Sequence, residues 1–324
     1  ESRADYPELH GVCQPCGVEQ NHYRRTCFAM QILIVTAVFP PESVVSAQTS
    51  AQIAEDLAKE GHQVSVIAPF PSRPSGKLYP GYSRRLFSKD NYTDAIKVQR
   101  CFSTLSRESR LASRFFENIS FGITGGLAVL FAKKPDVIYS NNWALFASGL
   151  LAFIAHLRHI PLLLCVQDIY PEQLIAQGRL RREGWMVRLL QEIDRKIANS
   201  ACSIIVISES LAEIYRSSRN VSHERVHVIT NWANSDSIIP NDPAAILYRQ
   251  KHAIDKRAFV VVYGGNIAFA AGVEVLILSF GMLRDLRDTY LIIAGEGNQL
   301  ESCKRISIDV GNSRIYFHTP WPRS

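Results

Sequence analysis

The sequence predicts an open, doubly wound α/β fold with mainly parallel strands. From Met30 onward, apolar runs rich in Val, Ile and Leu alternate with helical segments. Most of these runs are continuously apolar, as expected for strands that helices cover on both faces. In addition, residues 259–300 place two apolar strands that end in glycines on either side of one helix, which is the pattern of a βαβ unit.

The elements can be taken in chain order. The expected strands are Gln31–Phe39, His62–Phe70, Val98–Ser103, Asp136–Asn141, Pro161–Asp168, Cys202–Ser208, Arg225–Asn231, Phe259–Gly264, Tyr290–Ala294 and Arg314–His318. Between the first two strands, alanines recur on one helical face and Gly61 follows as the expected C-cap. Alternation of strands and helices in this way implies a doubly wound open sheet.

The chain is expected to divide into an extension, one complete domain and one partial domain. Residues 1–29 are polar and aperiodic, so we interpret them as a disordered or spurious extension. A polar, proline-containing stretch at 238–257 separates the strand that ends at Asn231 from the strand that begins at Phe259. We therefore expect an N-terminal domain at 30–238 and part of a second domain at 239–324.

Composition describes an ordinary globular protein. Hydrophobic residues make up 47% of the chain and charged residues 20%. The net charge of +6 suits anionic ligands or an anionic membrane surface, although scattered, solvated Lys and Arg explain it equally well. No apolar run reaches the ~18 residues of a membrane span, and no secretory signal is visible.

The seven cysteines favour a reducing, cytoplasmic location. Their number is odd, and Cys165 and Cys202 lie inside apolar strand-like runs. Cys13-x-x-Cys16 with Cys27 and a nearby histidine leaves a metal site in the extension as an alternative. Because a second close ligand pair at zinc-finger spacing is absent, we expect no metal site.

Two glycine turns are candidates for binding an anion. They consist of Gly264, Gly265 and Asn266, and of Gly295, Glu296 and Gly297. Glycine lets a phosphate approach the backbone, and the following helix offers free N–H groups. A tight strand-to-helix connection would require the same glycines, so that interpretation stays open beside the functional one.

The usual nucleotide-binding motifs are missing. A dinucleotide-binding domain needs G-x-G-x-x-G after its first strand, whereas this strand runs into Phe39-Pro40-Pro41-Glu42. Gly295-x-Gly297 lacks the third glycine, and no Gly-Lys-Ser/Thr sequence forms a P-loop.

Polar residues follow several other strands. Asp168 and Glu172 come just after an apolar strand, where Asp168 could orient sugar hydroxyls; helix capping is the competing explanation. Asn141 and Asn142 end another strand and could bind a sugar or cap a helix. Asn231 either borders a ligand or only shapes the turn between domains.

Taken together, these segments resemble the bacterial family 4 retaining glycosyltransferases of the GT-B fold, in particular the subgroup that builds capsule, O-antigen and exopolysaccharide. The resemblance is carried by motifs at strand ends that occur in the family's order: Phe39-Pro40-Pro41-Glu42, Gly61-His62-x-Val64-x-Val66, Val166-Gln167-Asp168-Ile169-Tyr170-Pro171-Glu172, Val228-Ile229-Thr230-Asn231-Trp232, Tyr263-Gly264-Gly265-Asn266 and Ala294-Gly295-Glu296-Gly297.

The resemblance implies a fold and a reaction. Two Rossmann-like, doubly wound domains are expected, the second incomplete in this chain. A nucleotide-diphosphate sugar would bind the C-terminal domain and a lipid-linked saccharide acceptor the N-terminal domain. The sugar would be transferred with retention, without a metal or other cofactor, and no nucleic-acid partner is expected.

It also implies site residues. Gly264, Gly265 and Asn266 would border the donor diphosphate, while Gly295, Glu296 and Gly297 would lie beside the nucleobase and ribose. Asp168 and Glu172 are the catalytic candidates. The candidates on the acceptor side or in the cleft are Ser46, Asn141, Asn142 and Asn231.

The chain departs from the family's pattern in several places. The stretch Ser43-Val44-Val45-Ser46 stands where many members have two glycines, and Asn266 and Ala271 stand where many have an Arg and a Lys that clamp the diphosphate. The family's two glutamates, spaced seven residues apart, would lie beyond Ser324. From this pattern we expect a C-terminally truncated fragment with little or no transferase activity.

Two further interpretations stay open. A basic, aromatic segment, Arg107–Lys134, is either an amphipathic helix on the inner face of the cytoplasmic membrane or a helix packed on the sheet. The alternatives to a transferase are a GT-B epimerase acting on UDP-N-acetylglucosamine and a degenerate GT-B module that binds without chemistry.

Overall fold

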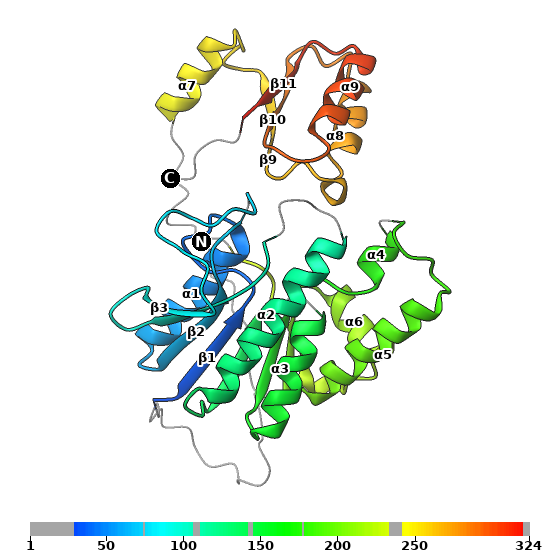
Figure 1. Cartoon of the computed structure of the whole chain (residues 1–324). Helices are drawn as coiled ribbons and strands as arrows, with labels where there is room; N and C mark the ends of the chain where they lie inside the picture. Colours follow the sequence, from blue (N-terminus) through cyan, green and yellow to red (C-terminus); the bar gives the residue numbers. More distant parts are fainter. Residues whose placement is uncertain are drawn as a thin grey trace, which may run out of the picture. The chain divides into compact units, whose positions relative to one another are not determined.

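The computed structural model describes residues 29–319, except 74, 106–110, 142–144, 177 and 233–241. The expected extension, its candidate metal ligands and Asn142 lie outside the described residues. The chain forms two compact units, Glu1–Asn231 and Trp232–Ser324, and each is considered by itself (Figure 1).

Unit one contains an eight-stranded sheet of order β3-β4-β2-β1-β5-β6-β7-β8. Its strands are β1 (Gln31–Thr36), β2 (Gln63–Pro69), β3 (Phe87–Asn91), β4 (Lys97–Cys101), β5 (Val137–Asn141), β6 (Leu162–Val166), β7 (Ser203–Val206) and β8 (Val226–Val228). All neighbouring pairs are parallel except β3 with β4. The predicted strands therefore form, each somewhat shorter than its apolar run.

Helices cover both faces of this sheet. They are α1 (Val45–Lys59), α2 (Leu111–Phe131), α3 (Leu145–Leu157), α4 (Glu172–Ala176), α5 (Trp185–Ser200) and α6 (Glu209–Ser217). Leu33 and Val35 of β1 pack in a core with α2, α3, α5 and α6, whereas Ile32 and Ile34 pack with α1 on the other face. Because successive strand residues point to opposite faces, one continuously apolar strand supplies both cores.

Unit two contains a three-stranded parallel sheet of order β11-β10-β9. Its elements are α7 (Asp242–Lys251), β9 (Phe259–Gly264), α8 (Val273–Gly281), β10 (Thr289–Ala294), α9 (Leu300–Val310) and β11 (Ile315–His318). Leu291 and Ile293 of β10 lie in a core with α8 and α9, while Ile292 packs with Tyr248 of α7 and Ile254. The second, smaller parallel sheet confirms the predicted fold class.

Within the basic, aromatic segment, Leu111–Phe131 form helix α2, and one face of this helix is packed. Phe121 and Val129 are buried in the core, whereas Phe115 and Phe116 are exposed. Arg114 is paired with Glu117 of the same helix. None of the helices in the described part of the chain contains an apolar stretch that could span a bilayer.

Candidate functional site

A small cavity lies at the carboxyl edge of the unit-one sheet. Its volume is about 70 Å³. The lining residues come from the start of α1, the ends of β5 and β6, and helices α3, α5 and α6; they include Ser46, Asn141, Gln167, Asp168, Tyr170, Asp194 and Tyr215. Ligands of open α/β sheets bind at this edge. The structure thus brings together three of the sequence-predicted residues, namely Ser46, Asn141 and Asp168.

Asp168 is the carboxylate of this cavity that stays accessible. It lies two residues beyond β6 and is exposed to solvent. Its Oδ1 accepts a hydrogen bond from Gln173 Nε2 at 3.2 Å. Partial burial raises the pKa of Asp168, and the hydrogen bond from Gln173 opposes this shift. A carboxylate in this setting can accept a hydrogen bond from a sugar hydroxyl.

The side chain of Asn141 is held by a hydrogen bond inside the protein. Its side chain is buried, and Nδ2 donates to Ser50 Oγ of α1 at 3.3 Å. Ser50 Oγ in turn donates to the carbonyl oxygen of Ser46 at 2.9 Å. Asn141 therefore ties the end of β5 to the first turns of α1, and this contact fixes Ser46 at the cavity.

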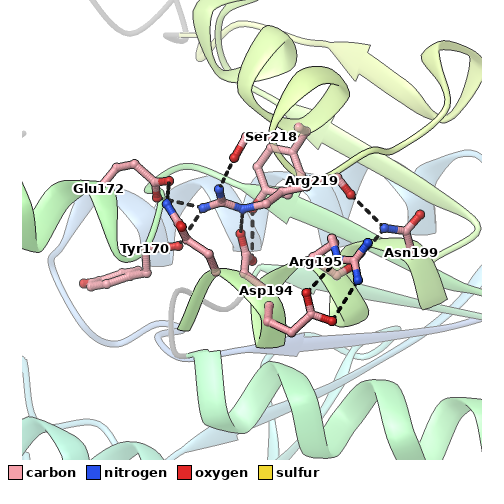
Figure 2. A network of polar contacts seen from close by, with 10 residues as sticks. Tyr170, Glu172, Asp194, Arg195, Asn199, Ser218 and Arg219 are labelled. Atoms are coloured by element: carbon pink, nitrogen blue, oxygen red, sulfur yellow. Dashed lines mark hydrogen bonds and ion pairs between the residues drawn. The ribbon is translucent and has the colours of Figure 1, made fainter. Parts of the chain in front are cut away.

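Glu172 takes part in a buried ion-pair network (Figure 2). Arg219, whose side chain is fully buried, donates from Nη2 to Glu172 Oε2 at 2.7 Å and from Nε to Asp194 Oδ2 at 2.8 Å. The same Nη2 donates to the carbonyl oxygen of Tyr170 at 3.1 Å. Arg219 thereby connects α5 to the loop that carries Asp168.

This network also explains the charge state of Glu172. Partial burial alone would raise its pKa, but hydrogen bonds from Arg219 and from Gln191 lower it. Both carboxylate oxygens are thus engaged by protein donors. The contacts favour a positioning role for Glu172, and its catalytic role stays a prediction.

Arg219 was not predicted from the sequence. It lies between polar residues just after α6, and its acidic partners are 25 and 47 residues away. No local pattern signals that such an arginine is buried.

Glu42 of the Pro-Pro-Glu motif joins two loops at the same sheet edge through hydrogen bonds. Glu42 is buried; its Oε1 accepts from the backbone N–H groups of Ser72 and Arg73 at 2.9 and 2.8 Å, and its Oε2 accepts from that of Phe39 at 3.2 Å. Burial raises the pKa of Glu42 to about 7, and this rise is limited by the hydrogen bonds from the backbone N–H groups of Ser72 and Phe39 and by the charge of Arg100. The loops after β1 and β2 are fixed to each other by these bonds.

The two glycine turns of unit two lie side by side at the carboxyl ends of β9 and β10. The N–H of Gly265 donates to the carbonyl oxygen of Ala294 at 3.0 Å, and the N–H of Ile267 donates to the backbone carbonyl oxygen of Glu296 at 2.8 Å. The side chains of Asn266 and Glu296 are exposed there. The six predicted donor-side residues therefore form one cluster within this unit.

The close approach of these turns accounts for two of the glycines. A Cβ atom on Gly295 would collide with the carbonyl oxygen of Gly265, and one on Gly297 would collide with that of Ile267. Substituting either glycine would therefore disturb the turns whether or not a ligand binds there. The exposed side chains of Asn266 and Glu296 are better probes of donor binding.

The remaining predicted residue, Asn231, is exposed after β8 and does not line the cavity. Among the described residues, no group of three or more His, Cys, Asp or Glu side chains could hold a metal ion.

Comparison with known proteins links this geometry to one family. Residues 46–232 match the family described as the glycosyl transferase 4-like domain. The putative colanic acid biosynthesis glycosyl transferase WcaI of Escherichia coli is 23% identical over 295 residues, which cover 89% of this chain and 71% of WcaI. An uncharacterized glycosyltransferase of Methanocaldococcus jannaschii is 23% identical over 285 residues, covering 87% of this chain and 67% of the relative.

Solved structures show the same fold. WaaG, a glycosyltransferase involved in lipopolysaccharide biosynthesis, matches with a TM-score of 0.59 and 15% identity, covering 90% of this chain and 70% of WaaG. Anabaena HepE in complex with UDP-glucose matches with a TM-score of 0.59 and 14% identity, covering 91% of this chain and 70% of HepE.

Proposed function

Because this chain belongs to the glycosyl transferase 4-like family and has the GT-B fold, we propose that it transfers a sugar from a nucleotide-diphosphate sugar to a lipid-linked saccharide in cell-surface polysaccharide biosynthesis. The transfer retains the anomeric configuration and needs no metal. In it, the bond between the sugar's anomeric carbon and the diphosphate breaks, and a bond to an acceptor oxygen forms as that oxygen loses its proton.

The observation that carries this proposal is the cavity at the carboxyl edge of the unit-one sheet. It presents the accessible carboxylate of Asp168 beside Ser46 and Asn141. Polar groups that converge on a concave site at this edge suit a saccharide, because sugar hydroxyls need both donors and acceptors. We assign Asp168 to orienting the acceptor hydroxyl and assisting the loss of its proton.

The donor is assigned to the glycine turns of unit two. Gly264, Gly265 and Gly297 are exposed in these turns. Helices α8 and α9 begin at Val273 and Leu300, shortly after the turns, so their N-terminal N–H groups are the candidates to offset the charge of the leaving group. HepE, whose structure contains UDP-glucose, supports a nucleotide sugar as the ligand and makes UDP-glucose the first donor to test.

The relatives support the acceptor class that we propose. WcaI and WaaG are described as acting in colanic acid and lipopolysaccharide biosynthesis, which is consistent with a lipid-linked saccharide as the acceptor. We therefore place the reaction at the cytoplasmic face of the membrane, where the net charge of +6 favours contact with anionic lipids.

The test is transfer from UDP-sugars, beginning with UDP-glucose, to lipid-linked saccharides in a membrane extract, measured as UDP release and as label in the lipid fraction. Asp168→Asn should lower the rate by about 10²-fold or more if the carboxylate assists proton transfer. Asp94→Asn, at an exposed loop position of the same unit, is the matched control. Donor and acceptor binding without any transfer would instead support a non-catalytic module.

A further inference from the structure

The segment Arg179–Leu189, between α4 and the second turn of α5, combines exposed apolar side chains with arginines. Trp185 is 72% exposed, Leu189 49% and Met186 44%. The arginines of this segment are all exposed, namely Arg179, Arg181, Arg182 and Arg188. We call this segment the α5 tip. Exposing a side chain as large as tryptophan forgoes the stabilisation that its burial would supply, so such a surface often marks a contact site.

Packing within unit one does not use the apolar side of the tip. Helix α5 buries Val187, Ile197 and Ala198. Trp185, Met186 and Leu189 are exposed in its first two turns. The helix therefore carries an exposed apolar patch at its start in addition to its buried residues.

The charges of the tip are not neutralised within the described residues. No ion pair is formed there by Arg179, Arg181, Arg182 or Arg188, and Glu183 is the one acidic residue of the segment. Further along α5 the situation differs, because Arg195 pairs with Glu192. A cluster of unpaired arginines around tryptophan and leucine is complementary to an anionic, partly apolar surface.

We propose that the α5 tip docks onto an anionic lipid surface. Tryptophan favours the interface between headgroups and acyl chains, while arginine reaches the lipid phosphates with its guanidinium group. This inference rests on the proposed function, because a lipid-linked acceptor is presented at such a surface. The tip is also connected to the candidate site, since Asp194 of the same helix lines the cavity and binds Arg219.

The experiment is co-sedimentation of the 324-residue chain with phosphatidylcholine vesicles that contain or lack phosphatidylglycerol. Binding should require phosphatidylglycerol and should be lost near 1 M NaCl, where the Debye length is about 3 Å. Arg181→Glu/Arg182→Glu should weaken binding at least about tenfold. The matched control is Arg84→Glu/Arg85→Glu, which changes the charge equally at exposed positions before β3, the strand at one edge of the sheet.

Tryptophan fluorescence provides a second measurement. Emission should shift to the blue on adding anionic vesicles, and Trp185→Phe should abolish that shift while retaining most of the binding, because phenylalanine keeps an aromatic ring at the interface. Trp185→Asp should weaken binding. Equal binding by the tip and control double variants, or a blue shift that persists in Trp185→Phe, would overturn the proposal.

Two further readouts separate the explanations. If light scattering shows a dimer that Arg181→Glu/Arg182→Glu dissociates while vesicle binding is unchanged, the tip binds a second copy and the lipid proposal fails. Transfer to a detergent-dispersed acceptor tests the chemistry without a bilayer. Transfer without vesicle binding refutes only the docking inference, whereas vesicle binding without transfer refutes only the proposed function.

Discussion

Arg219 carries a positive charge on a side chain that has no exposed surface. Its guanidinium contacts the carboxylates of Glu172 and Asp194 and the carbonyl oxygen of Tyr170 (Figure 2). Burying ions is costly, so such a network contributes little net stability relative to apolar packing. Removing one member is different, because it leaves the opposite charge buried and uncompensated.

Arg219→Met should therefore lower the free energy of unfolding by about 3–5 kcal/mol. Urea unfolding measures this change. Arg195→Met, on the same helix as Asp194, is the matched control. The ion pair of Arg195 with Glu192 is exposed to solvent, so its loss should leave the unfolding midpoint unchanged. Similar midpoints for the two variants would show that the network does not hold unit one together.

The same network shows which site residues a sequence can reveal. Asp168 was predicted because it follows a buried strand, and strand ends mark the ligand edge of a parallel sheet. Glu172 follows in the same loop, but its partner Arg219 is distant in the chain. The difference between an accessible carboxylate and a paired one depends on tertiary contacts, which a linear pattern does not contain.

At the level of elements, the apolar strands could be predicted and the polar edge strand could not. Continuous runs such as Gln31–Thr36 are visible because both faces of a central strand are buried. The edge strand β3, with the sequence FSKDN, is polar and half exposed, and it pairs antiparallel with β4. Its position depends on the free edge of β4 and not on its own hydrophobicity.

Helices α2 and α3 pack closely because glycines lie between them. A Cβ atom on Gly122 would lie 3.0 Å from the backbone Cα of Ala147, whereas one on Gly126 would lie 2.8 Å from Cδ1 of Ile154. The terminal methyl of an isoleucine can rotate away, but a helix backbone must move as a whole. The two glycines therefore differ in how they limit helix packing.

Gly122→Ala should consequently destabilise unit one by about 1–3 kcal/mol through overpacking. Gly126→Ala should be close to neutral, because the gain in helix propensity of up to about 1 kcal/mol offsets the adjustment of Ile154. Thermal or urea unfolding of both variants tests this difference. Equal destabilisation would mean that α3 does not resist the added methyl group at Ala147.

At the level of the whole molecule, the candidate residues are divided between the two compact units. The cavity with Asp168 belongs to residues 1–231, and both glycine turns belong to residues 232–324. Such a separation is expected if one unit binds the acceptor and the other binds the donor. Donor affinity should then depend on residues of the second unit alone.

Glu296→Gln should weaken the binding of UDP-glucose by roughly tenfold, because an exposed carboxylate that accepts a hydrogen bond from the donor is replaced by a neutral amide. Asp309→Asn is the matched control, since Asp309 is exposed near the end of α9 that lies away from the turns. Asp168→Asn should leave donor affinity unchanged even though it lowers the rate of transfer. Isothermal titration with UDP-glucose measures all three variants. If Asp168→Asn weakened UDP-glucose binding as much as Glu296→Gln, donor recognition would involve both units and the proposed division would be wrong.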